Sequence, residues 1–310
     1  MKLGYLLPTR ERIMEGRPET GPLLSLAQRA AGLGFESIWV GDSLLARPRH
    51  DPLTLLAAVA GRVPGVELGT AVLLPALRNP VVLAHQVATL DQVSEGRFIL
   101  GVGIAADAPS IRAEFAAAGV PFDKRVGRMM EGLRLAKALW TGEAVDWDGR
   151  WPVTQGVLAP TPFRKGGPPL WIGGNLQSSL DRAGKFFDGW FPIAPDPATF
   201  ATQWAGIKDT ARGLGRDADA MTGAMYLTVA LDDDADKANQ RLDVFLERYY
   251  SAPAPALRRR QAHYAGPAGG LGAFLQAYAD AGATHLMVRF AGDPEPQMDA
   301  TAKVRRELGW

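Results

Sequence analysis

The chain has 310 residues, 47% of them hydrophobic, so it is long enough and apolar enough to bury a large core. Its formal net charge is +1, with both signs spread along the chain, which argues against a nucleic-acid-binding face and an acidic tail. Cysteine is absent, which excludes disulfides, thiolate chemistry and the commonest structural zinc sites.

The first apolar run in chain order is KLGYLL, at residues 2–7, and it is typical of a strand. The segment around it has too few apolar residues for a signal peptide, and no apolar run of the chain is long enough to span a membrane. We therefore expect a cytoplasmic protein that makes no membrane contact.

Short apolar runs then alternate with amphipathic helical patterns to the end of the chain. Strands are expected at 2–7, 37–41, 66–74, 97–103, 170–174, 189–193, 223–231 and 284–290. Helices are expected at 23–34, 52–63, 79–94, 124–140, 178–187, 198–215, 234–250, 270–281 and 297–308. Strands separated by helices imply a parallel sheet with crossover connections.

This pattern predicts an α/β fold, a (β/α)8 TIM barrel formed by a single domain over residues 1–310, with a doubly wound sheet as the alternative. The segment 143–169 interrupts the alternation and is rich in Gly, Pro and Trp. We expect it to be an insertion after the fourth β/α unit, with a small hairpin about Asp148 and Gly149.

The segment FILGVGIAADA, at 98–108, runs from a strand into Gly-x-Gly-x-x-Ala, the spacing of a dinucleotide-binding fingerprint. A true fingerprint needs a helix that begins inside the glycines and an acidic residue at the end of the next strand. Here Pro109 follows the motif and no strand precedes Asp123, so a nucleotide site is not favoured. Gly103 instead suggests that a flat group approaches the strand end, whereas packing explains Gly101 equally well.

The segment LDQVSEGRFILGVG, at 90–103, resembles the signature of the bacterial luciferase-like monooxygenases, a flavin- and deazaflavin-dependent superfamily. Other segments are similar to the same superfamily in the same order: AGLGFESIWVGD (31–42), PPLWIGG (168–174), FDGWFP (187–192) and DAGATHLMVRF (280–290). The resemblance covers nearly the whole chain. It implies a (β/α)8 barrel whose cofactor lies at the C-terminal ends of the strands.

The resemblance also implies residues that bind the cofactor. Asp42 matches a polar position beside the ring, and Ala71-Val72 matches a non-proline cis peptide that supports the ring. The remaining matches are Gly103 and Ile104 in the strand 4 loop, and Gly173, Gly174, Asn175, Ser178 and Ser179 at the phosphate end. Glycines and serines at a helix N-terminus offer N–H groups to an anion.

Polar side chains after strands are the candidates for chemistry. Arg10 and Arg289 follow or end strands, where they would hold an anionic substrate or a phosphate, and His50 is a candidate general base. Many members of the superfamily carry a histidine where this chain has Ser43, and some carry a glutamate where it has Ala105 and Ala106. The catalytic candidates are therefore Asp42, Ser43, His50 and Arg289, and no metal site is expected.

The resemblance implies a flavin-dependent oxidoreductase. The first reading is an FMN-dependent monooxygenase that uses reduced flavin from a separate reductase, with O2, on a small organic substrate. The alternative is hydride transfer with coenzyme F420, whose acidic tail would suit the basic runs RPRH (47–50) or RRR (258–260). A flavin-binding protein without turnover is a third reading, and a barrel hydrolase or lyase lacks the residues it needs. A homodimer is expected from the superfamily.

Overall fold

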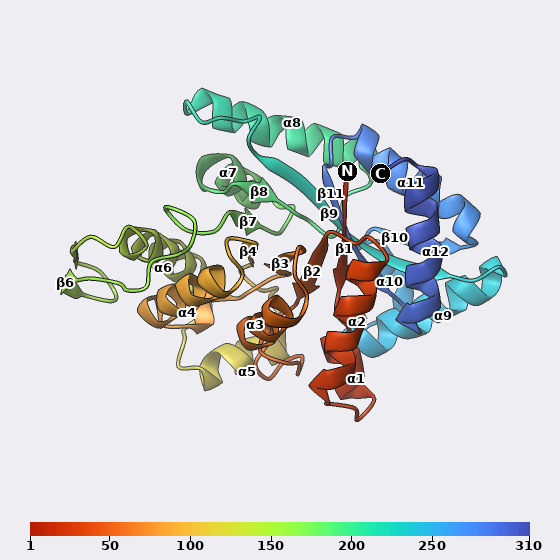
Figure 1. Ribbon diagram of the computed structural model, residues 1–310, viewed down its shortest axis with the longest axis horizontal. Helices are drawn as coiled ribbons and strands as arrows, with labels where there is room; N and C mark the ends of the chain where they lie inside the picture. The colour runs from red at the N-terminus through yellow and green to blue at the C-terminus, as the bar shows by residue number, and fades with distance from the viewer. The chain divides into compact units, whose positions relative to one another are not determined.

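The computed structural model describes residues 1–310 and contains two compact units. The terminal unit comprises Met1–Glu11, Glu19–Trp39 and Trp171–Trp310. The middle unit comprises Arg12–Pro18 and Val40–Leu170. In Figure 1 the colour follows the chain, so that the middle unit runs mainly from orange to green and the last part of the terminal unit from green to blue.

The strands of the terminal unit pair in parallel throughout. They are β1 (Lys2–Leu6), β2 (Ser37–Val40), β7 (Leu170–Ile172), β8 (Gly189–Trp190), β9 (Thr222–Leu231), β10 (His263–Gly266) and β11 (His285–Phe290). β1 lies between β2 and β11, β11 also pairs with β9, and β9 pairs with β8 and β10. β7 completes the series by pairing with β8. A run of parallel strands of this kind needs crossover helices between them.

Those helices are largely the ones expected from the sequence. They are α1 (Thr9–Met14), which begins in this unit, α2 (Thr20–Gly32), α7 (Gln177–Phe186), α8 (Pro197–Gly213), α9 (Ala235–Tyr250), α10 (Ala254–Arg258), α11 (Ala268–Asp280) and α12 (Pro294–Glu307). α8 and α12 each begin with proline directly after an aspartate, Asp196 or Asp293, whose side chain accepts a backbone N–H of the first turn. Proline at the first position and a carboxylate cap both favour a helix start.

The middle unit contains the parallel pair β3 (Glu67–Thr70) and β4 (Phe98–Val102). Its helices are α3 (Pro52–Arg62), η1 (Pro75–Leu77), α4 (Pro80–Val93), α5 (Pro109–Ala117), η2 (Phe122–Lys124) and α6 (Arg125–Leu139). The expected insertion holds an antiparallel hairpin, β5 (Val145–Trp147) with β6 (Val153–Gly156). Asp148 and Gly149 lie in its turn, as the sequence predicted.

The core of the terminal unit includes a layer of aromatic side chains around a buried histidine. Trp39 packs against Trp171 and His285, with ring centroids 5.3 and 5.6 Å apart. The Ser37 hydroxyl accepts from Trp39 Nε1 and is also hydrogen-bonded to His285 Nε2 at 2.7 Å. Gly4 belongs to the same layer because a Cβ atom there would lie 2.3 Å from Ser37 Oγ. This layer is therefore packed without space for any larger residue at position 4.

Five elements differ from the sequence-based expectations. The third strand ends at Thr70 rather than at residue 74, and the chain resumes pairing only as a single bridge from Leu73 to Val102. The segment 104–123, in which no helix was expected, contains α5, since Pro109 starts this helix instead of breaking it. α1 and α10 are short helices that were not expected. β10, around His263, adds a ninth parallel strand where no strand was expected.

Burial of His285 leads to a pH-dependent stability. Burial, with smaller contributions from Lys2 and the N-terminus, lowers the pKa of His285 to about 3. The unfolded chain binds this proton below about pH 6.5, whereas the folded chain does not. The free energy of unfolding should therefore fall by up to about 1.4 kcal/mol per pH unit as the pH drops from 6.5 towards 3.

Urea denaturation at several pH values between 7.5 and 4.5 measures this dependence. His285→Asn, which keeps an acceptor for Ser37, should lower the slope. His85→Asn, at an exposed position of α4, is the matched control and should retain it. Identical slopes in the parent and both variants would exclude His285 as the source.

Candidate functional site

Asp42 follows β2 directly and is held by an ion pair. Its side chain is 1% exposed, and its two oxygens accept from Arg78 Nη1 and Nη2 at 2.5 and 3.0 Å. The backbone N–H of Leu74 donates to the same carboxylate at 2.9 Å. A two-pronged contact with a guanidinium fixes both distance and orientation. Asp42 therefore positions the segment after β3, and its charge is matched by Arg78.

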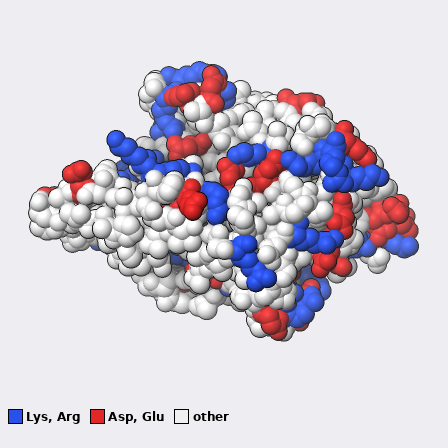
Figure 2. Space-filling view, viewed as in Figure 1, with Lys and Arg blue, Asp and Glu red and all other residues white.

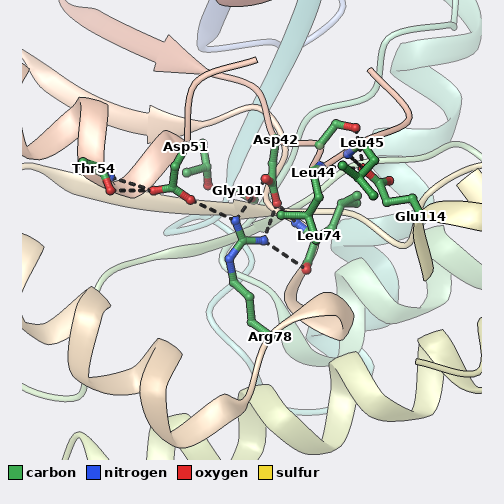
Figure 3. Close-up of polar contacts among 11 residues, drawn as sticks. Asp42, Leu44, Leu45, Asp51, Thr54, Leu74, Arg78, Gly101 and Glu114 are labelled. Carbon is green, nitrogen blue, oxygen red and sulfur yellow. Dashed lines mark hydrogen bonds and ion pairs between the residues drawn. The ribbon is translucent and has the colours of Figure 1, made fainter. Parts of the chain in front are cut away.

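Arg78 also binds the far end of the loop that follows β2. In Figure 3 its guanidinium lies between Asp42 and Asp51, and Nη2 is 3.2 Å from the Asp51 carboxylate. Asp51 in turn caps α3 by accepting from the backbone N–H of Thr54 at 2.9 Å. Arg78 was not among the residues predicted from the sequence. Arg78 lies after a strand and just before Asn79, the N-cap of α4. A position after a strand was the reason for selecting Arg10 and Arg289, and the same reasoning could have selected Arg78.

The ends of β2, β3 and β4 meet at the Ala71–Val72 peptide bond. This bond is cis, as the resemblance implied. The Ala71 N–H donates to the Val40 carbonyl at 2.8 Å, and Leu73 and Gly103 are joined by a backbone hydrogen bond of 2.9 Å. A Cβ atom at Gly103 would lie 2.5 Å from Val72 Cγ2, so glycine is needed there for Val72 to approach. The glycines after β4 thus serve a close contact between strand ends, and the next helix begins only at Pro109.

The loop after β2 wraps around the carboxylate of Glu114, which comes from α5. Glu114 Oε1 accepts from Ser43 Oγ at 2.7 Å and from the backbone N–H groups of Leu44, Leu45 and Ala46 at 2.5, 2.7 and 3.2 Å (Figure 3). Burial opposes the charge, but these hydrogen bonds outweigh it and lower the pKa of Glu114. Successive N–H groups converging on one oxygen form an anion-binding nest. Glu114 therefore fixes the backbone of this loop as a carboxylate.

Ser43 is fully engaged in that arrangement. Its hydroxyl donates to Glu114, and its oxygen accepts from the backbone N–H of Arg47 at 2.9 Å. The residue is 7% exposed. Its contacts order the turn. Glu114 was not predicted from the sequence because no helix was expected at 104–123 and nothing nearby in the chain indicates that its carboxylate binds the loop after β2.

His50 and Ile104 lie in the same unit and are tied to backbone groups. His50 Nε2 is 2.7 Å from the Pro18 carbonyl oxygen, so Nε2 donates, while Nδ1 is buried without a hydrogen-bond partner. The Ile104 carbonyl accepts from Arg125 Nε at 2.9 Å, which anchors the segment after β4 to the start of α6. The His50 ring is therefore fixed with a lone pair available on Nδ1.

The predicted phosphate end lies between β7 and α7 in the terminal unit. Gly174 has φ +97°, a conformation that glycine adopts readily, and its carbonyl accepts from Trp190 Nε1 at 2.8 Å. Gly174, Asn175 and Ser178 are exposed, whereas Ser179 is buried. The N-cap residue of α7, Leu176, offers no side-chain acceptor, so the first N–H groups of the helix stay available to an anion. Gly173 lies in the same loop, one residue after β7.

Arg289 on β11 is buried, with only 1% of the residue exposed. Its Nη2 donates to Thr228 Oγ1 and Gln261 Oε1 at 2.9 and 3.0 Å, and Nη1 donates to the Tyr250 hydroxyl at 3.2 Å. Four aromatic rings face the guanidinium, those of Tyr226, Phe245, Tyr249 and Tyr250, with centroids 4.5–5.5 Å from its central carbon. Arg289 is thus a fixed positive charge held by neutral groups and rings. Arg10 of α1 stacks on Tyr249 at 5.1 Å.

The predicted residues fall into three groups. The middle unit brings together Asp42, Ser43, His50, Ala71, Val72, Gly103 and Ile104. The terminal unit holds the loop Gly173–Ser179 and, separately, the cluster around Arg289.

No group of three or more His, Asp or Glu side chains is arranged to hold a metal ion, and none of the helices is long and apolar enough to cross a membrane. Acidic and basic side chains are interspersed on the face shown in Figure 2.

Comparison with known proteins identifies relatives of this chain and supports its fold. The family model described as luciferase-like monooxygenase matches residues 1–308. The F420-dependent glucose-6-phosphate dehydrogenase of Mycolicibacterium smegmatis is 31% identical over 225 residues, which cover 70% of this chain and 66% of that protein. The chain therefore spans slightly less than two thirds of the length of this relative.

Two solved structures share the fold over almost the full chain. A monooxygenase, RslO1 from Streptomyces bottropensis, superposes with a TM-score of 0.82 at 24% identity, covering 99% of this chain and 98% of its own. An F420-dependent secondary alcohol dehydrogenase, in complex with an F420-acetone adduct, gives a TM-score of 0.84 at 21% identity with the same coverage. The fold is the closed parallel TIM barrel predicted from the sequence, and the doubly wound sheet is excluded.

Arg78 should be required for stability. Arg78→Met leaves the Asp42 carboxylate buried without its cation, and we expect the free energy of unfolding, measured with urea at neutral pH, to fall by about 3–5 kcal/mol. The double variant D42N/R78M should recover part of this loss, because the uncompensated charge is gone. As a control, Arg212→Met removes an arginine that is 53% exposed in its ion pair and should be near neutral. Equal losses in R78M and R212M would contradict the proposed importance of the buried pair.

Glu114 should control the mobility of the loop after β2. Glu114→Ala removes the acceptor of three backbone N–H groups, so amide hydrogen exchange at Leu44, Leu45 and Ala46 should become faster by on the order of tenfold or more. Exchange resolved to single residues by NMR measures this. Asp107→Ala, an exposed position in the segment before α5, should leave these rates unchanged. Unchanged exchange in E114A would show that the loop holds its shape without the carboxylate.

Proposed function

Because the chain belongs to the luciferase-like monooxygenase family, we propose that it is an F420-dependent oxidoreductase that transfers a hydride between the cofactor and a small organic alcohol or carbonyl compound. The observation that favours this is the sequence relative of 31% identity, an F420-dependent dehydrogenase. F420, when bound, supplies hydride donation or acceptance at a carbon centre. The residues of this chain then have to bind it, orient the substrate and handle a proton.

Each unit by itself holds residues that suit one part of such a cofactor. In the middle unit, Ala71–Val72 and Gly103 offer backbone groups to a ring, the Val72 side chain fills the space beside Gly103, and the Asp42–Arg78 pair braces this segment. At the phosphate end, Gly174, Asn175 and Ser178 are exposed beside the uncapped first turn of α7. Exposed backbone N–H groups at a helix N-terminus bind phosphate oxygens.

Proton transfer at the substrate oxygen is assigned to His50 in this proposal. Asp42 and Glu114 are bound as carboxylates by Arg78 and by backbone N–H groups, so neither is suited to exchange a proton during turnover. His50 donates through Nε2 to a carbonyl oxygen and keeps a lone pair on Nδ1. An imidazole can accept a proton in the direction of alcohol oxidation and return it in the direction of carbonyl reduction.

The FMN-dependent monooxygenase expected from the sequence is the second candidate. It is favoured by Ser43, Ala105 and Ala106, which stand where family members carry acid–base residues. Oxygenation by reduced flavin and O2 depends on the protein mainly to position the reactants and to exclude water. Such an enzyme would draw its reduced flavin from a separate reductase. The homodimer expected from the family belongs to either version of the proposal.

Parallel titrations of the purified protein with F420 and with FMN, followed by fluorescence and calorimetry, test the proposal. Binding of F420 with a dissociation constant on the order of micromolar or tighter, with weaker FMN binding, is the expected result. The reverse preference would replace F420 by FMN and direct attention to a partner reductase. Binding of neither cofactor would overturn both candidates.

A further inference from the structure

Arg289 lies near the C-terminal end of β11 and points into the barrel. His285, Met287 and Arg289 are alternate residues of this strand, so their side chains lie on the same side. On that side His285 packs against Trp39 and Trp171, whose strands do not pair with β11, so this side is the interior. Arg289 is the last but one residue of the strand, and it therefore lies at the end where barrels of this kind bind their ligands.

The hydrogen-bond partners of this buried guanidinium are all neutral. They are the Thr228 hydroxyl, the Gln261 side-chain carbonyl and the Tyr250 hydroxyl. Thr228 and Gln261 are themselves 1% and 5% exposed, so the contacts lie inside the terminal unit. No carboxylate lies within ion-pair distance of the guanidinium nitrogens, and Glu11 acts on it only from farther away. A buried charge that only neutral groups balance is costly, and an anion at close range would lower that cost.

Some N–H groups of Arg289 are not used by the protein. A guanidinium has five N–H donors. Two on Nη2 and one on Nη1 are engaged by Thr228, Gln261 and Tyr250. Nε is buried and has no hydrogen-bond partner, and Nη1 has a second N–H. Because a buried donor without an acceptor costs free energy, a ligand atom that accepts from Nε or Nη1 would be bound favourably.

The side chains that cover Arg289 come from the last two turns of α9. The ring centroids of Phe245 and Tyr250 lie 4.9 and 5.5 Å from the guanidinium carbon, and both residues are half-buried. Leu242 and Leu246, in contrast, are fully buried and anchor the helix to the core. The hydrogen bond from Nη1 to Tyr250 is the longest of the three, at 3.2 Å, and Tyr250 is the last residue of the helix. It is therefore the contact that an incoming acceptor replaces first.

We propose that Arg289 binds the carboxylate group of a small organic acid, while Thr228 and Gln261 hold the guanidinium in place. A carboxylate carries the opposite charge and accepts from the N–H groups left at Nε and Nη1. A phosphate group presents three acceptor oxygens and would need further donors. The site lies within the terminal unit alone, so it goes beyond the proposed function and does not depend on which cofactor is bound.

NMR titration of the protein without cofactor tests this site, with acetate as the probe and acetamide as its neutral isostere. The Nε–H resonance of Arg289, identified by its loss in Arg289→Gln, should move downfield with acetate and not respond to acetamide. R289Q should weaken acetate binding, followed through backbone amide resonances, by about tenfold or more. Tyr250→Phe removes the hydroxyl that occupies Nη1, so it should tighten acetate binding by roughly three- to tenfold.

Tyr264→Phe is the matched control, because it removes a hydroxyl that donates to the Pro267 carbonyl, and it should bind acetate like the parent. Equal acetate affinity in the parent and R289Q would overturn the role of Arg289. An Nε–H resonance that acetate leaves unchanged, or that responds to inorganic phosphate but not to acetate, would also overturn the proposal. Because the protein is free of cofactor in this experiment, these results leave the proposed function intact, and the cofactor titrations test that function separately.

Discussion

The strand ends of the middle unit depend on one buried ion pair, between Asp42 and Arg78. A carboxylate that is 1% exposed is costly to bury unless a cation and further donors satisfy it, and Arg78 with the Leu74 N–H does so. The consequence extends beyond the pair itself. Because Arg78 also contacts Asp51, one guanidinium holds both ends of the loop after β2 against the segment that follows β3. The loop carries Ser43, Arg49 and His50, so their positions all derive from this contact.

The presence of glycine at three positions is explained by side chains from other parts of the chain. Gly41 makes room for Arg49, Gly103 makes room for Val72, and Gly4 makes room for the Ser37–Trp39 hydrogen bond. In each case the constraint comes from a side chain that fills the space a Cβ atom would occupy. The glycine spacing at Gly101 and Gly103 resembles a nucleotide-binding fingerprint, but at Gly103 the structure explains the glycine by the close approach of Val72.

The sequence was sufficient to predict the barrel because each strand is a short buried run and each helix shows an apolar face, properties that depend only on nearby residues. It failed at α5, where a proline that begins a helix was interpreted as one that prevents it. It also failed to single out Arg78 and Glu114. The partners of these residues lie 36 and about 70 positions away in the chain, and no local pattern records such a contact. The short β10 was missed for the related reason that its pairing with β9, rather than its composition, makes it a strand.

The Glu114 carboxylate binds backbone N–H groups of the loop after β2. The shape of this loop therefore depends little on which side chains it carries. The N–H groups of Leu44, Leu45 and Ala46 that bind the carboxylate are present in every residue except proline. Leu44 and Leu45 are 44% and 63% exposed, so their side chains contribute little to the anchoring. Substitutions at positions 44 and 45, other than to proline, should therefore leave the backbone of this loop in place.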